Sequence, residues 1–351
     1  MSFAEWVEPG GTAPSDSGLT AASFSSNTAR ETFSLARTSS RVIARPSPIL
    51  VASRPAPNIP ASVPFPLGYH PCAMGAQNTI YSHTSPYHDI HVEDLGYLRV
   101  LRFERNRQSS MYLDAPFDTD FEYPAYLHTP LALKPDATRT LVIGLGGGSV
   151  VKRMWRDYPD MRLDVVELDP EIVEVAHRFF ELPRDPRIRV YVDDGRAFLE
   201  TTTETYDIVI VDAFDEDRVP RPLTTEEFLR TTRDHLAPDG VVAYNFIGSP
   251  KGDRSKPFRS LYRTLANVWR HVWVFRLDEG VAAEGSNLIL LGSDADVSDD
   301  VLRSRLADRV GGKVTVPAFH RFGEDLYTGE IRTGDVPIIT DPPRAKPRRT
   351  R

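Results

Sequence analysis

The chain has 351 residues, a formal net charge of −7 and a single cysteine, Cys72. The acidic balance argues against a general nucleic-acid-binding protein, whose surface would be basic, and one cysteine excludes an intramolecular disulfide or a cysteine-cluster metal site. No apolar run approaches the roughly 18 residues that a membrane-spanning helix needs. With 40% hydrophobic and 26% charged residues, the composition predicts a cytoplasmic globular protein of one large or two modest domains.

Residues 1–66 are rich in Ser, Ala, Thr and Pro, are poor in bulky apolar residues, and show no sustained period. This composition is typical of a disordered tail. The stretch has no apolar core of the kind found in a secretory signal, and Glu5 and Glu8 stand where a transit peptide avoids acidic residues. We expect a dispensable tail or a start codon assigned too early.

Residues 67–133 are predicted to form a small antiparallel β-domain with a lead-in helix. Between residues 79 and 113, apolar residues alternate imperfectly with polar ones, and Asp94-Leu95-Gly96 suits the turn of a hairpin. The pattern favours two or three strands. A helix from Tyr123 to Leu133 is expected to lead into the next domain.

Residues 134–341 are predicted to form a nucleoside-binding α/β domain, and its first strand carries the strongest signal. Leu141 to Ile143 form a continuous apolar run, typical of a strand that is buried on both faces. A glycine turn and a helix from Val150 to Tyr158 follow. Glycines allow the backbone to approach a ligand closely, and a helix N-terminus offers free N–H groups. The candidate ligand contacts in this turn are Gly144, Gly146 and Gly148.

Acidic residues stand at the ends of the next two predicted strands. Glu167, in the strand over residues 163–169, follows the glycine turn by about 20 residues, where a doubly wound sheet places the carboxylate that binds ribose hydroxyls. We prefer it to Asp169, which is predicted to cap the next helix. A strand over residues 188–192 ends in Asp193-Asp194-Gly195, whose carboxylates either accept from an adenine amine or cap the following helix.

The fourth strand, over residues 206–211, ends in Asp212-Ala213-Phe214-Asp215. Four strands thus carry polar groups at their carboxyl ends, the rim at which open α/β sheets bind ligands. Further elements are expected at residues 225–236 (helix), 241–246 (strand), 258–268 (helix), 271–277 and 287–291 (strands). A basic, proline-rich tail from residue 342 to 351 is predicted to fray.

Seven segments together resemble the spermidine synthase (polyamine aminopropyltransferase) family, and most closely its diverged spermidine synthase-like branch. They are YHDIHVEDLG, FERNRQSSMYLD, IGLGGGSV, VVELDPEIVEVA, DDGRAFL, YDIVIVDAFD and PLTTEEFL. The resemblance implies a Rossmann-like, methyltransferase-type sheet with a small N-terminal β-domain. It also implies a homodimer or homotetramer that takes decarboxylated S-adenosylmethionine, passes its aminopropyl group to a polyamine-type amine, and releases methylthioadenosine.

Carried over position by position, the resemblance implies roles for individual side chains. The nucleoside would contact Gln108, its ribose Glu167, and its adenine Asp194 with Gly195. The amine substrate would be held by Asp215 and by Tyr123, the remaining member of the family's Y-H-E segment. Asp212 would be the general base, because a protonated amine is no nucleophile and a carboxylate must take its proton as nitrogen attacks.

Several positions depart from the family pattern, mainly on the amine side. Gly147 replaces an aspartate of the family's glycine loop, and Pro124-Ala125 replace a histidine and a glutamate. His88 stands in place of a glutamine, no tyrosine occurs between residues 281 and 287, and the match to a C-terminal T-D-D-Y motif ends at Pro342. Losing one carboxylate contact to a cation weakens binding by about 1–3 kcal/mol, enough to change the preferred substrate.

Two other functions are therefore open. A methyltransferase would use intact S-adenosylmethionine, with Gly147 leaving room for the cofactor's carboxylate. A non-catalytic nucleoside-binding protein would have lost its amine site. His128 is expected to anchor a helix against the sheet, and the histidines His83, His88 and His91 lack the spacing of a metal site, so no metal is predicted.

Overall fold

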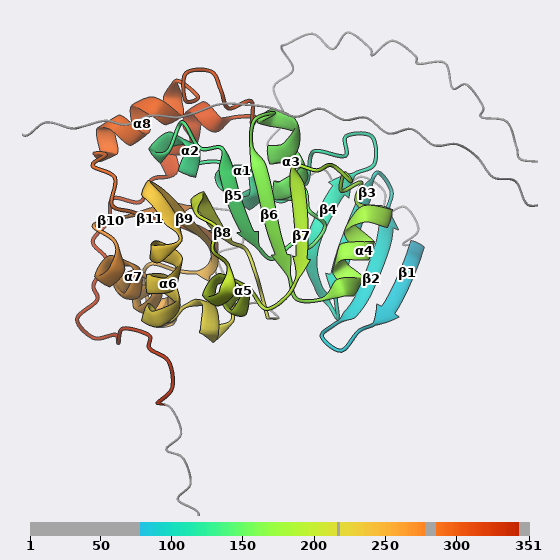
Figure 1. Ribbon diagram of the computed structural model, residues 1–351, viewed down its shortest axis with the longest axis horizontal. Coiled ribbons are helices and arrows are strands. Elements are labelled where there is room, and N and C mark those ends of the chain that lie inside the picture. The colour runs from blue at the N-terminus through green and yellow to red at the C-terminus, as the bar shows by residue number, and fades with distance from the viewer. Residues whose placement is uncertain (1–77, 216–217, 278–285, 344–351) are drawn as a thin grey trace, which may run out of the picture. The chain divides into compact units, whose positions relative to one another are not determined.

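The computed structural model describes residues 78–215, 218–277 and 286–343. The predicted tail of residues 1–66, Cys72 and most of the tyrosine-free stretch of residues 281–287 lie outside this part of the chain, as does the basic tail beyond residue 343. The described residues begin with an antiparallel sheet and continue into a larger mixed sheet with helices (Figure 1).

The antiparallel sheet has four strands, rather than two or three, in the order β1-β2-β3-β4. They are β1 (Asn78–Thr84), β2 (Asp89–Leu95), β3 (Leu98–Phe103) and β4 (Asn106–Tyr112). The predicted hairpin turn is confirmed: Leu95 pairs with Leu98 across Gly96, whose φ is 65°. The edge strand β1 is largely exposed on both faces, so its sequence shows no apolar alternation.

The single lead-in helix predicted from Tyr123 to Leu133 is wrong. The segment forms two short helices, α1 (Tyr123–Tyr126) and α2 (Pro130–Leu133). The break follows from Pro130, because proline has no N–H to continue the hydrogen-bond ladder and therefore sits at the start of the second helix.

The large sheet has seven strands in the order β10-β11-β9-β8-β5-β6-β7. Neighbouring strands from β9 to β7 pair in parallel, whereas β11 pairs antiparallel with both β9 and β10. The strands are β5 (Arg139–Ile143), β6 (Arg162–Glu167), β7 (Ile188–Val192), β8 (Tyr206–Val211), β9 (Leu236–Gly248), β10 (His271–Arg276) and β11 (Ser286–Ser293). All seven were expected from the sequence, although β9 is longer than predicted. The Rossmann-like class is confirmed.

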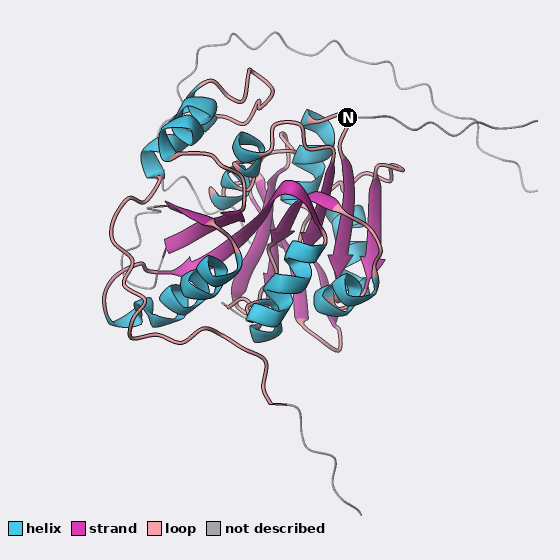
Figure 2. Cartoon of the chain, turned by 60° about the vertical axis from the view of Figure 1, so that its left-hand side comes forward, coloured by secondary structure: helices cyan, strands magenta, loops and turns pink. Residues whose placement is uncertain are grey.

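Helices cover both faces of this sheet (Figure 2). They are α3 (Ser149–Asp157), α4 (Pro170–Phe179), α5 (Gly195–Thr201), α6 (Glu226–Asp234), α7 (Lys256–Val268) and α8 (Asp299–Ala307). Val142 packs into a core with α3 and α8, whereas Leu141 and Ile143 pack into a second core with α5, α6 and α7. This two-sided burial explains the apolar run of β5. Helix α8 and the 3-10 helices η1 (Arg221–Leu223), η2 (Asp253–Ser255) and η3 (Phe319–Asp325) were not predicted.

A third core joins the small sheet to α4. Ile90, Val92, Leu101 and Met111 of the sheet pack against Ile172, Val175 and Phe180 at α4 and its end. Asp169 caps α4 as predicted, accepting from the backbone N–H of Glu171, and it also accepts from the Ser85 hydroxyl of the turn after β1. These contacts hold the small sheet against α4, which in turn contacts β6 and β7 of the large sheet. None of the described helices has the length and apolar character needed to cross a bilayer.

Candidate active site

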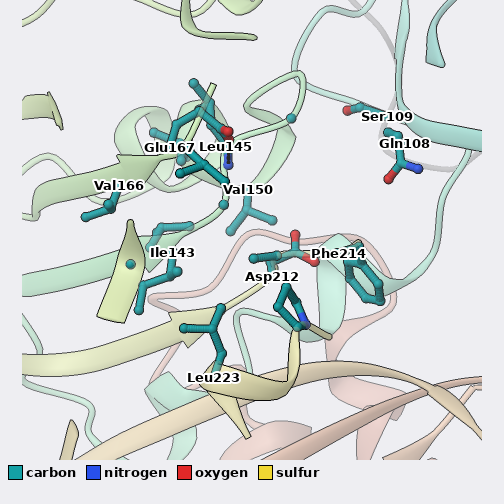
Figure 3. A pocket seen from close by; sticks show the side chains of 18 of the residues that line it. Gln108, Ser109, Ile143, Leu145, Val150, Val166, Glu167, Asp212, Phe214 and Leu223 are labelled. Carbon is teal, nitrogen blue, oxygen red and sulfur yellow. Dashed lines mark hydrogen bonds between the residues drawn. The ribbon is translucent and has the colours of Figure 1, made fainter. Parts of the chain in front are cut away.

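A pocket lies where the carboxyl ends of β5, β6 and β8 meet the small sheet and α1. Figure 3 shows Glu167 and Leu145 on one side, Gln108 and Ser109 on the other, and Asp212 between them. Residues at the ends of β5, β6 and β8 and in the segment after β7, all singled out in the sequence, line this pocket. The predicted gathering of polar groups at one rim is confirmed.

The glycine turn after β5 packs directly on the backbone of β8. A Cβ on Gly144, whose φ is 97°, would lie 2.3 Å from the carbonyl oxygen of Asp212, so this position requires glycine. The Asp212 N–H donates to the Ile143 carbonyl at 2.9 Å. Gly144 and Gly146 line the pocket, and Gly148 is the N-cap of α3. The turn therefore fixes the glycine backbone and Asp212 relative to each other.

Glu167 is tied to the glycine turn. Its Oε2 accepts from the Leu145 N–H at 2.9 Å, and its Oε1 accepts from the Asp169 N–H at 3.0 Å. Burial raises the pKa of Glu167, and these backbone N–H groups act against that rise. Glu167 lines the pocket, whereas the buried Asp169 is engaged as a helix cap. The structure thus places Glu167 where the sequence predicts a ribose contact, and that contact stays a prediction.

Asp194 caps α5, one of the two roles that the sequence left open. Its Oδ1 accepts from the backbone N–H groups of Arg196 and Ala197, each at 2.9 Å. Asp193, Asp194 and Gly195 also line the pocket. The helix cap and an adenine contact are therefore compatible, because a carboxylate has two oxygens and several lone pairs.

Asp212 lies at the end of β8 and is the partly buried carboxylate at the centre of the pocket. The Nδ2 of Asn245 donates to its Oδ1 at 2.9 Å, and the Tyr123 side chain also hydrogen-bonds to it. Burial raises the pKa of Asp212 to about 7, and the two hydrogen bonds oppose this rise. A carboxyl with a pKa near neutral is suited to accept a proton at physiological pH.

Asn245 was not singled out in the sequence. It lies inside β9 and is 1% exposed. The sequence does contain a sign of it, because Asn245 is a lone amide in the otherwise apolar run VVAYNF. A polar side chain in such a run indicates a buried hydrogen bond but does not identify the partner. Only the neighbouring positions of β8 and β9 in the sheet bring it to Asp212.

Of the three remaining residues predicted to bind the substrates, two line the pocket and one does not. Gln108 and Tyr123 line the pocket, from β4 and α1. Asp215 is exposed, forms backbone hydrogen bonds with Arg218, and is not among the lining residues. The structure therefore brings Gln108 and Tyr123 together with Asp212 and leaves Asp215 outside the cavity wall.

His88 and Phe103 form an aromatic wall that the sequence did not predict. Their rings stack with centroids 4.0 Å apart and planes 9° from parallel, and both residues line the pocket from the small sheet. His88 stands where the family resemblance led us to expect a glutamine.

The space beside Gly147 is filled. A Cβ on this residue would lie 2.7 Å from the Ser109 hydroxyl oxygen and 2.9 Å from the Phe180 ring. The Ser109 and Ser149 hydroxyl oxygens are 3.2 Å apart, and both residues line the pocket. This end of the pocket therefore presents hydroxyl groups where the resemblance predicts a carboxylate.

His128 does not line the pocket. It is buried, its Nδ1 lies 2.7 Å from the Tyr158 hydroxyl, and burial lowers its pKa to about 3. The contact links the segment between α1 and α2 to the end of helix α3, whereas the sequence predicted that His128 anchors a helix against the sheet. No group of three or more His, Cys, Asp or Glu side chains suited to hold a metal occurs among the described residues.

Comparison with known proteins gives one consistent family. The spermine/spermidine synthase domain model matches residues 121–247. A polyamine aminopropyltransferase of Vibrio vulnificus is 32% identical over 209 residues, covering 56% of this chain and 69% of the relative. One of Chromobacterium violaceum is 30% identical over 230 residues, covering 64% and 84%. A probable spermidine synthase from Corynebacterium glutamicum superposes with a TM-score of 0.56 at 25% identity, covering 75% of this chain and 99% of the other. The chain therefore belongs to the spermine/spermidine synthase family of polyamine aminopropyltransferases.

Proposed function

We propose that this protein is an aminopropyltransferase that moves the aminopropyl group of decarboxylated S-adenosylmethionine to a polyamine-type amine and releases methylthioadenosine. The relatives named above carry this activity in their names. The observation that carries the proposal is the Asp212 carboxyl, whose pKa of about 7 suits proton transfer and which lies in one pocket with the glycine turn and Glu167.

The donor nucleoside would occupy the side of the pocket formed by the large sheet. Glu167 would accept hydrogen bonds from the ribose hydroxyls, and its two backbone contacts hold it in place for this. Asp194 and Gly195 would face the adenine, and Gly144 and Gly146 would allow close approach of the backbone. Gln108 would contact the nucleoside from β4.

In the reaction, the acceptor nitrogen attacks the carbon next to the sulfonium. The new C–N bond forms as the C–S bond breaks, the bonding electrons return to sulfur, and a neutral thioether leaves. The proton lost by the nitrogen passes to Asp212. Because the sulfonium is a good leaving group, positioning of the two substrates should supply much of the rate.

The acceptor amine would bind on the side of Tyr123 and Asp215. Tyr123 lines the pocket beside Asp212. Asp215 is exposed and stands three residues further along the chain, and it would hold a distal ammonium group by a charge-assisted hydrogen bond. A homo-oligomeric state, a cytoplasmic location and the absence of nucleic-acid and membrane partners remain predictions from the sequence.

A second candidate function, methyl transfer from intact S-adenosylmethionine, is favoured by one observation. Ser109 and Ser149 line the end of the pocket at Gly147, where a carboxylate that would repel the cofactor's own carboxylate is absent. A hydroxyl group can donate to a carboxylate and can accept from an ammonium group, so it accommodates either.

The deciding experiment is product identification by mass spectrometry. The purified protein is supplied separately with decarboxylated and intact S-adenosylmethionine, together with a panel of amines. Methylthioadenosine and an amine heavier by one aminopropyl unit are expected, and this would also name the acceptor. S-adenosylhomocysteine would establish the methyltransferase instead. Tight nucleoside binding with neither product would leave the non-catalytic alternative.

A further inference from the structure

We propose that Asn245 is a positioning residue for the reaction, because its amide donates to Oδ1 of Asp212, holds this carboxylate in place and stabilises the ionised form that receives the proton. The inference rests on the proposed function and extends it to a residue that is not part of the pocket wall. The main evidence is the 2.9 Å hydrogen bond from Asn245 Nδ2 to Asp212 Oδ1, which joins the end of β8 to the neighbouring strand β9.

The contact is rigid. Val211, the residue before Asp212, pairs in parallel register with Tyr244, the residue before Asn245, so both side chains leave adjacent strands at the same level. Tyr244 is fully buried and donates its hydroxyl to the Leu223 carbonyl at 2.7 Å. An amide on such a strand can fix a carboxylate more precisely than a loop residue could.

The amide oxygen of Asn245 indicates that this residue does not serve to stabilise the fold. Its Oδ1 is buried and has no hydrogen-bond partner among the described residues. A buried acceptor without a donor destabilises the folded state, and an apolar residue of similar volume would avoid this penalty. The amide is therefore best explained by the bond that its Nδ2 makes to Asp212.

The contribution of Asn245 to Asp212 can be compared with that of the other polar groups in the pocket. Tyr123 of α1 is the other hydrogen-bond partner of the carboxyl. The other titratable groups of the same pocket are Glu167 at the end of β6, Asp193 and Asp194 before α5, and His88 after β1. Asn245 is an uncharged donor, so it stabilises the ionised carboxylate without adding a charge that would repel a cationic amine.

The test compares the parent protein with Asn245→Leu over pH 5.5 to 9.5, measuring kcat/KM for aminopropyl transfer. The parent rate should rise with pH as Asp212 ionises. In the variant the midpoint of this rise should move up by about one pH unit, because the ionised form loses a hydrogen bond. At pH 7 its rate should be lower by about fivefold, and the deficit should shrink towards pH 9.

Thr232→Val is the matched control. Thr232 is fully buried and donates to the Phe228 carbonyl within α6, so the variant also loses a buried hydrogen bond but has no contact with Asp212. Its midpoint should equal that of the parent. An Asn245→Leu midpoint equal to the parent's, or a rate loss of the same size at every pH, would overturn the positioning role and leave Asn245 a structural residue.

A second readout does not depend on turnover. The stability difference between the parent and Asp212→Asn, followed by urea unfolding across pH 4 to 9, reports the ionisation of Asp212 in the folded protein. In the Asn245→Leu background, the pH at which this stability difference changes should shift upward. A pH dependence that does not shift overturns the proposal. If Asn245→Leu does not fold, Asn245→Ser takes its place. If the parent transfers no aminopropyl group, the proposed function fails, while this measurement still decides the role of Asn245.

Discussion

The hydroxyl oxygen of Ser109 occupies the space that a side chain on Gly147 would need, since a Cβ there would lie 2.7 Å from it. Phe180 closes the same space from α4 at 2.9 Å. Gly147, where the resemblance implies an aspartate, is thus accompanied by close packing of the small sheet and Phe180 over the glycine turn. Restoring the side chain alone should not restore the family's contact.

Gly147→Ala should therefore destabilise the fold by about 1–3 kcal/mol, as overpacking of a filled site does. Urea unfolding measures the change. Gly334→Ala is the control, because a Cβ at Gly334 meets nothing within 4 Å. Adding Ser109→Ala should recover part of the loss, since it removes the hydroxyl that the new methyl group meets. Equal stability of Gly147→Ala and Gly334→Ala would contradict the packing.

Asp212→Asn should reduce aminopropyl transfer by about 10²- to 10⁴-fold, because the amide cannot accept the proton. The affinity for methylthioadenosine, measured by calorimetry, should stay close to that of the parent. Asp160→Asn changes an exposed aspartate beyond α3 and serves as the control. A turnover of Asp212→Asn within a few-fold of the parent would exclude Asp212 as the base.

The same substitution should change stability in a pH-dependent way. The folded protein holds a proton on Asp212 up to a pKa of about 7, whereas the unfolded chain releases it near 3.8. The native state therefore binds more protons between these values, and its stability falls as the pH rises through this window. Asp212→Asn cannot ionise, so it should be more stable than the parent above pH 7.

Below about pH 4 both forms of residue 212 are uncharged, and the stability difference between Asp212→Asn and the parent should reach a minimum that no longer changes with pH. Urea unfolding at pH 4, 5.5, 7 and 8.5 tests this. A difference that is constant across the series would show that the pKa of Asp212 is not raised by folding.

Glu167→Gln should weaken methylthioadenosine binding by about 10- to 100-fold, because hydrogen bonds to a charged acceptor are stronger than those to an amide. The rate at saturating donor should change much less than the affinity. Glu204→Gln is the control, since Glu204 pairs with Arg139 at the opposite end of the sheet. Unchanged nucleoside affinity in Glu167→Gln would remove Glu167 from the donor site.

Asp215→Asn should raise the KM for the amine substrate and leave nucleoside affinity unaltered. Because Asp215 is exposed, its attraction to an ammonium group should weaken as salt is added. The effect of the substitution should therefore be larger at 20 mM than at about 500 mM ionic strength, where the Debye length is only a few ångströms. An amine KM that does not change at either ionic strength would place the amine elsewhere.

Much of the fold could be predicted from the sequence because its signals are local. The apolar run of β5, the glycine turn and the Asp169-Pro170 cap each depend on a few consecutive residues. Strands β7 and β8 were predicted at the residues that they occupy. The single lead-in helix was wrong because Pro130 has no N–H to continue the helix from α1 and instead begins α2.

The candidate residues of the donor side were also within reach of the sequence. Gly144, Glu167 and Asp194 stand at the ends of consecutive strands, and the carboxyl ends of parallel strands meet at one edge. The alternation of strands and helices in the sequence predicts a parallel sheet, and in such a sheet these three residues come together in one pocket.

Three features were decided only by the tertiary structure. Asn245 meets Asp212 because β9 lies beside β8, His88 stacks on Phe103 across the small sheet, and Ser109 fills the space next to Gly147. Each pair joins residues that are distant in sequence or belong to different strands, and no local pattern encodes such a contact. The sequence by itself determined which groups could serve the chemistry. Packing between strands decided how those groups are held, and burial of Asp212 set its pKa.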